Sequence, residues 1–192
     1  MKTHAIIPIF IPHAGCPHDC VFCNQKAITA RTAPPTPAEA EETINRNLAT
    51  IKENPNITTV EIAFFGGSFT GIPIEEQTEY LRIAKSYKDR GEIHQIHLST
   101  RPDYIDDTIL ENLKAHSVDV IELGVQSFDP VVLKRSNRGH DRDTVFRSAR
   151  MIKEWGFTLG IQLMIGLPGD SHFKCIDSVA ATVSLSPDIA RI

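Results

Sequence analysis

The sequence predicts an α/β protein, a partial (β/α)6 TIM-like barrel that lacks its last helix. Short apolar runs alternate with helix-forming stretches along the whole chain, and polar or glycine-rich residues follow the runs. Hydrophobic residues make up 41% of the chain and charged residues 23%, an ordinary globular composition. One well-cored domain accounts for 192 residues, so we expect a single domain over residues 1–192, truncated at its C-terminal end.

The first elements follow from local signals. Residues 5–11 are an apolar run of strand length. A capping box that begins at Thr36, with Pro37 at the first helical position, predicts a helix over residues 37–53. β-Branched and aromatic residues then predict a strand over residues 58–65.

The same alternation continues to the end of the chain. Tyrosine and aliphatic residues at helical spacing predict a helix over residues 74–90, and Gly91 follows as its stop. Strands separated by helices in this way form a parallel sheet with helical crossovers. The remaining predicted elements are a strand over 93–99, a helix over 106–115, a strand over 118–125, helices near 130–136 and over 141–155, a strand over 157–165, a helix over 171–184 and a last strand over 188–192.

Polar or glycine-rich residues stand at the ends of five consecutive predicted strands. The carboxyl ends of barrel strands converge on one site, whereas an open doubly wound sheet concentrates its site at one switch point. The pattern therefore favours the barrel, with the site at its carboxyl face. The residues concerned are the cysteine cluster within 16–23, Gly66-Gly67, Ser99-Thr100-Arg101, Gln126-Ser127 and Gly166-Leu167-Pro168-Gly169.

The cysteines indicate a metal site. Cys16, Cys20 and Cys23 have the spacing Cys-x3-Cys-x2-Cys, with no secretion signal before them, so metal ligation is favoured over a disulfide framework. Three thiolates leave one iron of a [4Fe–4S] cubane open, and an open position marks a reactive metal site. A zinc site with His13 or His18 as fourth ligand is the alternative, although no second ligand pair is visible.

The cysteine loop resembles the signature of the radical S-adenosylmethionine (SAM) superfamily. Further motifs resemble, in order, the radical SAM domain of the Elongator catalytic subunit (elongator complex protein 3), over roughly residues 5–192; the oxygen-independent coproporphyrinogen dehydrogenases are more distantly similar. Ser99 stands where the family usually has Glu, and these 192 residues hold no counterpart of that subunit's acetyltransferase domain. The motifs are Phe65-Gly66-Gly67-Ser68-Phe69-Thr70, Ser99-Thr100-Arg101-Pro102-Asp103, Glu122-Leu123-Gly124-Val125-Gln126-Ser127, Asn137-Arg138-Gly139-His140 and Gly166-Leu167-Pro168-Gly169.

The resemblance implies an enzyme. A reduced [4Fe–4S] cluster, fed by an electron donor, cleaves SAM to methionine and a 5′-deoxyadenosyl radical, which abstracts a hydrogen from substrate. In the Elongator subunit the substrate is the wobble uridine of tRNA, which implies a tRNA-modifying transferase. No catalytic acid, base or radical relay is identified. The implied cluster ligands are Cys16, Cys20 and Cys23, and the implied SAM contacts are Gly66, Gly67, Ser68, Gln126, Ser127 and Gln162.

A basic segment is a candidate RNA contact. The segment contains Lys134, Arg135, Arg138 and Arg142, whereas the chain as a whole has a net charge of −4. Basic residues bind the phosphates of RNA without reading its sequence. A solvated helix face is the simpler interpretation. Two other functions remain open: a coproporphyrinogen dehydrogenase-like or other radical SAM oxidoreductase, and a zinc-stabilised RNA-binding module without catalysis.

The sequence predicts a cytoplasmic protein with no membrane partner. No stretch approaches the roughly 20 apolar residues that a membrane span requires. The short apolar run near the start is interrupted by Pro8 and Pro12 and is followed by cysteines, which is unlike a signal peptide.

Overall fold

The computed structural model describes residues 3–12, 19–23 and 33–192, and in these ranges the chain forms one parallel six-stranded sheet. The strands lie side by side in the order in which they occur along the chain, and each pair is parallel. This confirms the predicted parallel sheet with helical crossovers. The strands are β1 (His4–Ile11), β2 (Thr59–Gly66), β3 (Gln95–Thr100), β4 (Val120–Gln126), β5 (Thr158–Leu163) and β6 (Ile189–Arg191).

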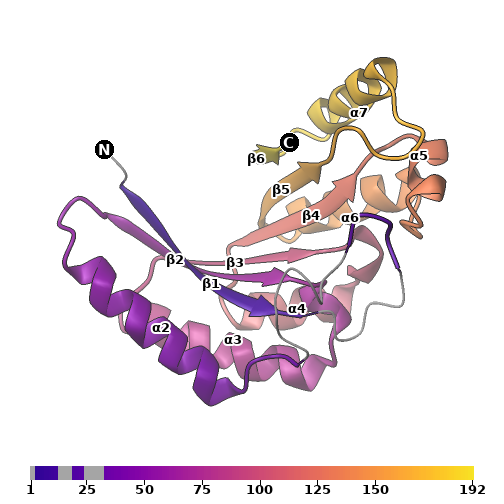
Figure 1. Ribbon diagram of the computed structural model, residues 1–192. Helices are drawn as coiled ribbons and strands as arrows, with labels where there is room; N and C mark the ends of the chain where they lie inside the picture. Colours follow the sequence, from indigo (N-terminus) through magenta and orange to yellow (C-terminus); the bar gives the residue numbers. More distant parts are fainter. Residues whose placement is uncertain (1–2, 13–18, 24–32) are drawn as a thin grey trace.

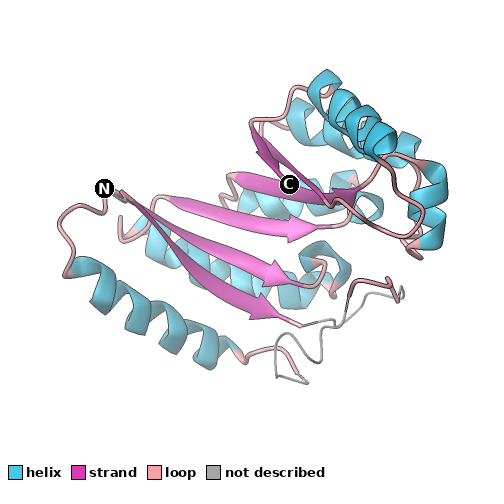
Figure 2. Cartoon of the chain, turned by 45° about the horizontal axis from the view of Figure 1, so that its top comes forward, coloured by secondary structure: helices cyan, strands magenta, loops and turns pink. Residues whose placement is uncertain are grey.

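The helices lie on the outer, convex face of the curved sheet, and the concave face carries none of them (Figures 1 and 2). The predicted capping box of the first helix is present, because the Thr36 side chain accepts from the Glu39 amide and the Glu39 side chain accepts from the Thr36 amide. Two 3-10 turns were not expected from the sequence. The helices are α2 (Pro37–Lys52), α3 (Ile74–Asp89), α4 (Asp107–Ala115), α5 (Pro130–Arg135), α6 (Arg142–Glu154) and α7 (His172–Ser184), and the turns are η1 (Phe69–Gly71) and η2 (Pro102–Tyr104).

Alternate residues of each strand face opposite sides of the sheet. On the outer face Ile62, Leu98 and Ile121 belong to the hydrophobic core that the helices cover. On the concave face the same strands carry Glu61 and Glu122, both buried. The sheet therefore has one apolar side, which packs under the helices and stabilises the fold, and one side that also carries charged groups.

The register of three strand pairs is fixed by the same device at the amino ends of the strands. The residue just before one strand donates its backbone amide to the carbonyl of a residue in the neighbouring strand. Its side chain accepts a hydrogen bond from the backbone amide of that same residue. His94 pairs in this way with Val60, at 2.8 and 3.0 Å. The other two cases are Asp119 with Ile96, at 2.9 and 2.8 Å, and Asp188 with Leu159, at 2.9 and 2.9 Å.

These register clamps matter because a slip of one residue would turn every side chain to the other face of the sheet. The clamps lie at the amino ends of the strands, and the polar residues predicted to form the site lie at the carboxyl ends. The strand register is thus fixed at the amino ends of the strands, and the candidate site lies at their carboxyl ends.

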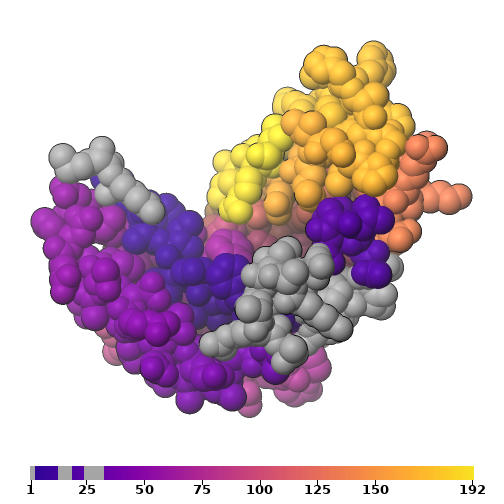
Figure 3. All heavy atoms as spheres, in the orientation of Figure 1, coloured from indigo at the N-terminus to yellow at the C-terminus, as the bar shows by residue number. Residues whose placement is uncertain are grey.

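The sheet is an arc whose two edge strands are β1 and β6. The molecule is hollowed between them, between the indigo residues of β1 and the yellow C-terminal residues (Figure 3). This arrangement matches the expected partial barrel. No helix in the described part of the chain has the length and apolarity that crossing a bilayer requires.

Candidate SAM and cluster site

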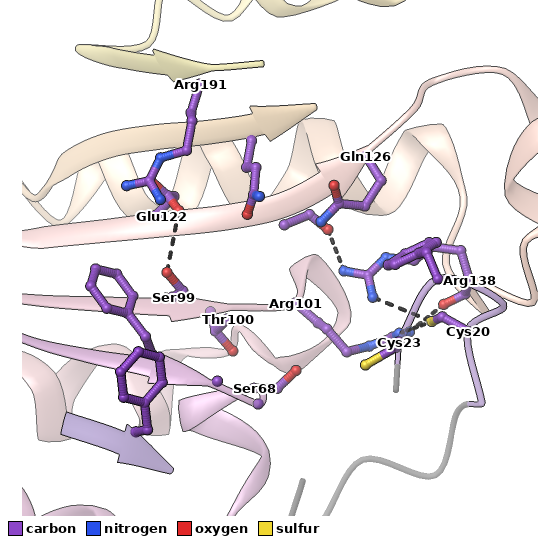
Figure 4. A pocket seen from close by; sticks show the side chains of 17 residues that line it. Cys20, Cys23, Ser68, Ser99, Thr100, Arg101, Glu122, Gln126, Arg138 and Arg191 are labelled. Carbon is purple, nitrogen blue, oxygen red and sulfur yellow. Dashed lines mark hydrogen bonds and ion pairs between the residues drawn. The ribbon is translucent and has the colours of Figure 1, made fainter. Parts of the chain in front are cut away.

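A cavity of about 440 Å³ opens at the carboxyl ends of the strands, on the concave face. All six strands, or the residues that directly follow them, contribute to it. Of the five predicted groups of strand-end residues, Cys20 and Cys23, Gly66-Gly67, Ser99-Thr100-Arg101 and Gln126 line the cavity, and the segment from Gly166 to Gly169 does not. Figure 4 shows Cys20, Cys23 and Arg138 at one end and Glu122 and Arg191 at the other. The lining residues are Phe10, Cys20, Phe22, Cys23, Phe65, Gly66, Gly67, Ser68, Ser99, Thr100, Arg101, Glu122, Gly124, Gln126, Arg138, Gln162 and Arg191.

Cys20 and Cys23 face this cavity together. A turn joins them, because the Cys23 amide donates to the Cys20 carbonyl at 2.8 Å. Cys20 is 4% exposed, and both cysteines are thiols and not halves of a disulfide. Two soft sulfur ligands at a pocket wall suit an iron–sulfur cluster. The predicted third ligand, Cys16, lies outside the described residues.

Gly66 and Gly67 bring the ends of β1 and β2 into close contact. Gly66 has φ +109°, and a Cβ there would lie 2.7 Å from the Ile11 carbonyl oxygen. The Gly67 amide donates to that same oxygen at 2.8 Å. The glycine pair is therefore required by the backbone, and it leaves main-chain atoms facing the cavity beside the buried Ser68.

Gln126 adopts a strained conformation at the end of β4. Its φ is +70°, which is unusual for a residue other than glycine, and the pairing with β5 shifts register between Gly124 and Gln126. The side chain is 7% exposed, and within the described structure its Oε1 has no hydrogen-bond partner. A strained residue with an unsatisfied buried acceptor in a cavity indicates a ligand contact. Gln162 of β5 lines the same cavity.

Two buried arginines stand next to the thiols. Arg138 is 7% exposed and donates to the Gly124 carbonyl and, at 3.6 Å, to the Cys20 sulfur. Burial, and then repulsion from Arg101, lower the pKa of Arg138 below its ordinary value. The Arg101 guanidinium pairs with the Asp103 carboxylate at 2.9 Å. The cavity therefore contains a buried positive charge that an anionic ligand would stabilise.

The structure corrects the expectation that Arg138 contacts RNA phosphates. Its side chain is directed inward at Gly124 and Cys20, so it is not part of an outer basic surface. Lys134, Arg135 and Arg142 are exposed, as a phosphate contact requires. The motif Asn137-Arg138-Gly139-His140 contains Arg138 and none of the other three basic residues, but it does not show which way the side chain faces.

Ser127 is also placed differently from expectation. It is buried outside the main cavity, where its hydroxyl accepts from the Asp129 amide at 3.1 Å and lies 3.4 Å from the Ser178 hydroxyl. Its role here is to shape the turn into α5. The segment from Gly166 to Gly169 likewise does not line the main cavity; Gly166 and Leu167 line a separate apolar pocket beside α7.

No ligand contact was predicted from the sequence for several lining residues: Ser99 and Glu122 were named only within motifs, and Phe10 and Arg191 were not singled out. Ser99 donates to Glu122 at 3.3 Å, and Arg191 lies 3.1 Å from the same carboxylate. Phe10 and Phe65, which are register partners, form the facing wall. The signal for all of them was the two-residue alternation along the strands, which places them on the concave face with the expected contacts.

The sequence profile of the radical SAM superfamily matches residues 10–179. A tRNA uridine(34) acetyltransferase from Methanocaldococcus infernus is 23% identical over 98% of this chain and 42% of its own length. The heme chaperone HemW of Bacillus subtilis is 27% identical over 90% of this chain and 46% of its own length. Among solved structures, the Methanocaldococcus infernus Elp3 with an N-terminal deletion has a TM-score of 0.70 at 19% identity, covering 94% of this chain and 42% of that one.

Fold and site together define a partial-barrel protein with two free thiols, Cys20 and Cys23, at a cavity on its carboxyl face. The chain belongs to the radical SAM superfamily. A [4Fe–4S] cluster and SAM are accordingly its cofactors, which removes the zinc-stabilised binding module as an interpretation of the cysteines. The chain spans about two-fifths to one-half of the length of the two curated relatives named above.

Proposed function

We propose that this chain is the radical SAM domain of a tRNA-modifying enzyme. Cys16, Cys20 and Cys23 hold the cluster, SAM binds beside it in the carboxyl-face cavity, and the substrate is a tRNA uridine. When bound, the reduced cluster and SAM together supply a 5′-deoxyadenosyl radical, which abstracts hydrogen from the substrate. A reductant is the required electron partner.

The observation that carries the proposal is the set of polar groups that line one cavity. SAM presents a carboxylate, an ammonium group and ribose hydroxyls. The buried Arg138 guanidinium suits the carboxylate, and the unsatisfied Oε1 of Gln126 suits a hydroxyl donor. The backbone at Gly66 and Gly67, with Ser68 beside it, is accessible to the ammonium group. Gln162 of β5, the register partner of Gly124, completes the proposed contacts.

The tRNA substrate is supported by the relatives and by the exposed charges. Three of the similar proteins are tRNA uridine(34) acetyltransferases. The exposed basic residues Lys134, Arg135 and Arg142 follow β4 and are proposed to contact RNA phosphates. Because these side chains do not line the cavity, they would bind the RNA around the target base and not the base itself.

A second radical SAM function is favoured by a different observation. The similarity to the heme chaperone HemW covers 90% of this chain at 27% identity, close to the value for the tRNA-modifying relatives. A porphyrin-related role therefore remains the alternative. Binding of haem or coproporphyrinogen with no binding of tRNA would favour it.

The test is anaerobic reconstitution with iron and sulfide, followed by addition of dithionite and SAM. We expect a brown protein that produces 5′-deoxyadenosine. Cys20→Ala should lose the cluster, whereas Cys175→Ala, a cysteine outside the main cavity, should keep it. Arg138→Met should keep the cluster and lose most SAM binding. A colourless protein that holds one tightly bound zinc would overturn the proposal.

A further inference from the structure

Arg101 links three parts of the site through one buried guanidinium. It is 2% exposed, and it follows β3 directly. Its Nε and Nη2 donate to the two carboxylate oxygens of Asp103 at 3.0 and 2.9 Å, and Nη2 also donates to the Arg138 carbonyl at 2.6 Å. Its Nη1 lies 4.0 Å from the Cys20 sulfur.

The two charges of this pair have opposite effects on any electron placed near Cys20. A positive charge beside a ligand sulfur stabilises the added electron, and a negative charge opposes it. Net charge and hydrogen bonds to the sulfurs are among the factors that set the reduction potential of iron–sulfur clusters. These effects are strong here because the guanidinium is buried and water screens it little.

We propose that Arg101 and Asp103 form a charge pair that tunes the reduction potential of the cluster bound at Cys20. Arg101 raises the potential, and Asp103 limits that rise. Both act as positioning and electrostatic residues and not as cluster ligands. The inference rests on the cluster assignment in the proposed function and requires neither SAM nor a substrate.

The test is a redox titration with dithionite, monitored by electron paramagnetic resonance, on reconstituted protein without SAM. We expect Arg101→Met to shift the cluster potential to more negative values, because a positive charge is lost while the negative charge of Asp103 stays. Asp103→Asn should shift the potential in the opposite direction. The double variant should lie between the two single variants.

A matched control is the exposed ion pair Arg90–Glu92, 2.6 Å apart, which lies between α3 and β3 at the other end of the sheet. Arg90→Met and Glu92→Gln should leave the cluster potential unchanged. If Arg101→Met fails to hold a cluster, Asp103→Asn decides the question, because the Asp103 side chain is 25% exposed and tolerates change better.

Two outcomes would overturn the inference. One is an unchanged potential in Arg101→Met or Asp103→Asn at full iron content. The other is a shift in the same direction in both, which would mean that the pair only packs the loop. Failure of the wild-type protein to bind a cluster at all would instead count against the proposed function.

Discussion

Gly66 is the residue at which backbone geometry and the site depend on each other most directly. Its φ is +109°, and only 2.7 Å would separate a Cβ from the Ile11 carbonyl oxygen, which excludes any side chain without movement of the backbone. We expect Gly66→Ala to lower the free energy of unfolding by more than about 2 kcal/mol and to weaken SAM binding. Urea unfolding and equilibrium SAM binding would measure both.

Gly91→Ala is the control for this substitution. Gly91 also has positive φ, +71°, but a Cβ there meets no atom within 4 Å. Gly91→Ala should lower the free energy of unfolding only by the strain of an alanine at positive φ, about 1–2 kcal/mol, and should leave SAM binding intact. Equal losses of stability and of SAM binding in both variants would show that the contact with Ile11 is unimportant.

His140 should make folding sensitive to acid. Burial, and then the charges of Arg138 and Arg101, lower the pKa of His140 to about 4 from an ordinary 6.5. The unfolded chain therefore binds more protons between these values, and the folded state loses stability as pH falls from about 6.5 towards 4. Across this range of pH, the free energy of unfolding should fall by about 3 kcal/mol in total.

The variant His140→Leu isolates this effect. The free energy of unfolding of the cluster-free protein, measured by urea titration between pH 7 and pH 5, should depend less on pH in the variant than in the wild type. The slopes are compared, since the absolute stability of the variant also reflects altered packing. If the free energy of unfolding depended on pH equally in the variant and the wild type, His140 would not be the source of the acid sensitivity.

At the scale of elements, the register clamps should be worth more than ordinary surface contacts. Asp119 accepts the Ile96 amide at 2.8 Å and also pairs with Lys88 at 2.6 Å. Asp119→Ala leaves that amide without its acceptor, so we expect a loss of about 1–3 kcal/mol in urea unfolding. Asp89→Ala removes only an exposed i,i+4 pair with Lys85, and should cost at most about 0.5 kcal/mol.

Most elements could be predicted because local signals and burial agree. The capping box at Thr36 and the apolar runs of β1 and β2 fix their elements before any tertiary contact is considered. The 3-10 turns and the register shift at Gln126 were not predictable in this way. They depend on contacts between distant segments, such as the Thr70 hydroxyl, 2.6 Å from the Thr100 hydroxyl.

The site shows the same division. Cys20, Gly66 and Gln126 carry recognisable patterns and do line the cavity. Arg138 carries a charge that the sequence cannot place, because an arginine in a connecting segment can face either solvent or a cavity until the fold orients it. In the fold the Arg138 side chain faces the cavity and donates to the Gly124 carbonyl, and no sequence pattern marks that carbonyl as its acceptor.

At the scale of the whole molecule, the exposed basic residues after β4 should govern RNA binding. Reversing both Lys134 and Arg135 to Glu is expected to weaken tRNA binding roughly tenfold and to reduce the salt dependence by about one unit for each phosphate that is no longer bound. Filter binding at several salt concentrations would measure this. SAM cleavage without RNA should be unaffected, since neither residue lines the cavity.

The control carries the same change of charge elsewhere. Arg46 and Arg82 are exposed on α2 and α3, on the other side of the molecule (Figure 1). Reversing them to Glu should leave tRNA affinity close to that of the wild type. Similar losses in both double variants would mean that net charge alone determines binding.

The order of the strands has a consequence for how the chain is made. Because β1 to β6 pair in the order of synthesis, each new strand meets a partner that has already left the ribosome. At roughly 5–20 residues per second, the interval between the emergence of Cys23 and that of Arg191 is on the order of ten to thirty seconds. During that time Cys20 and Cys23 have been made, but the later strands that line the cavity with them have not all followed.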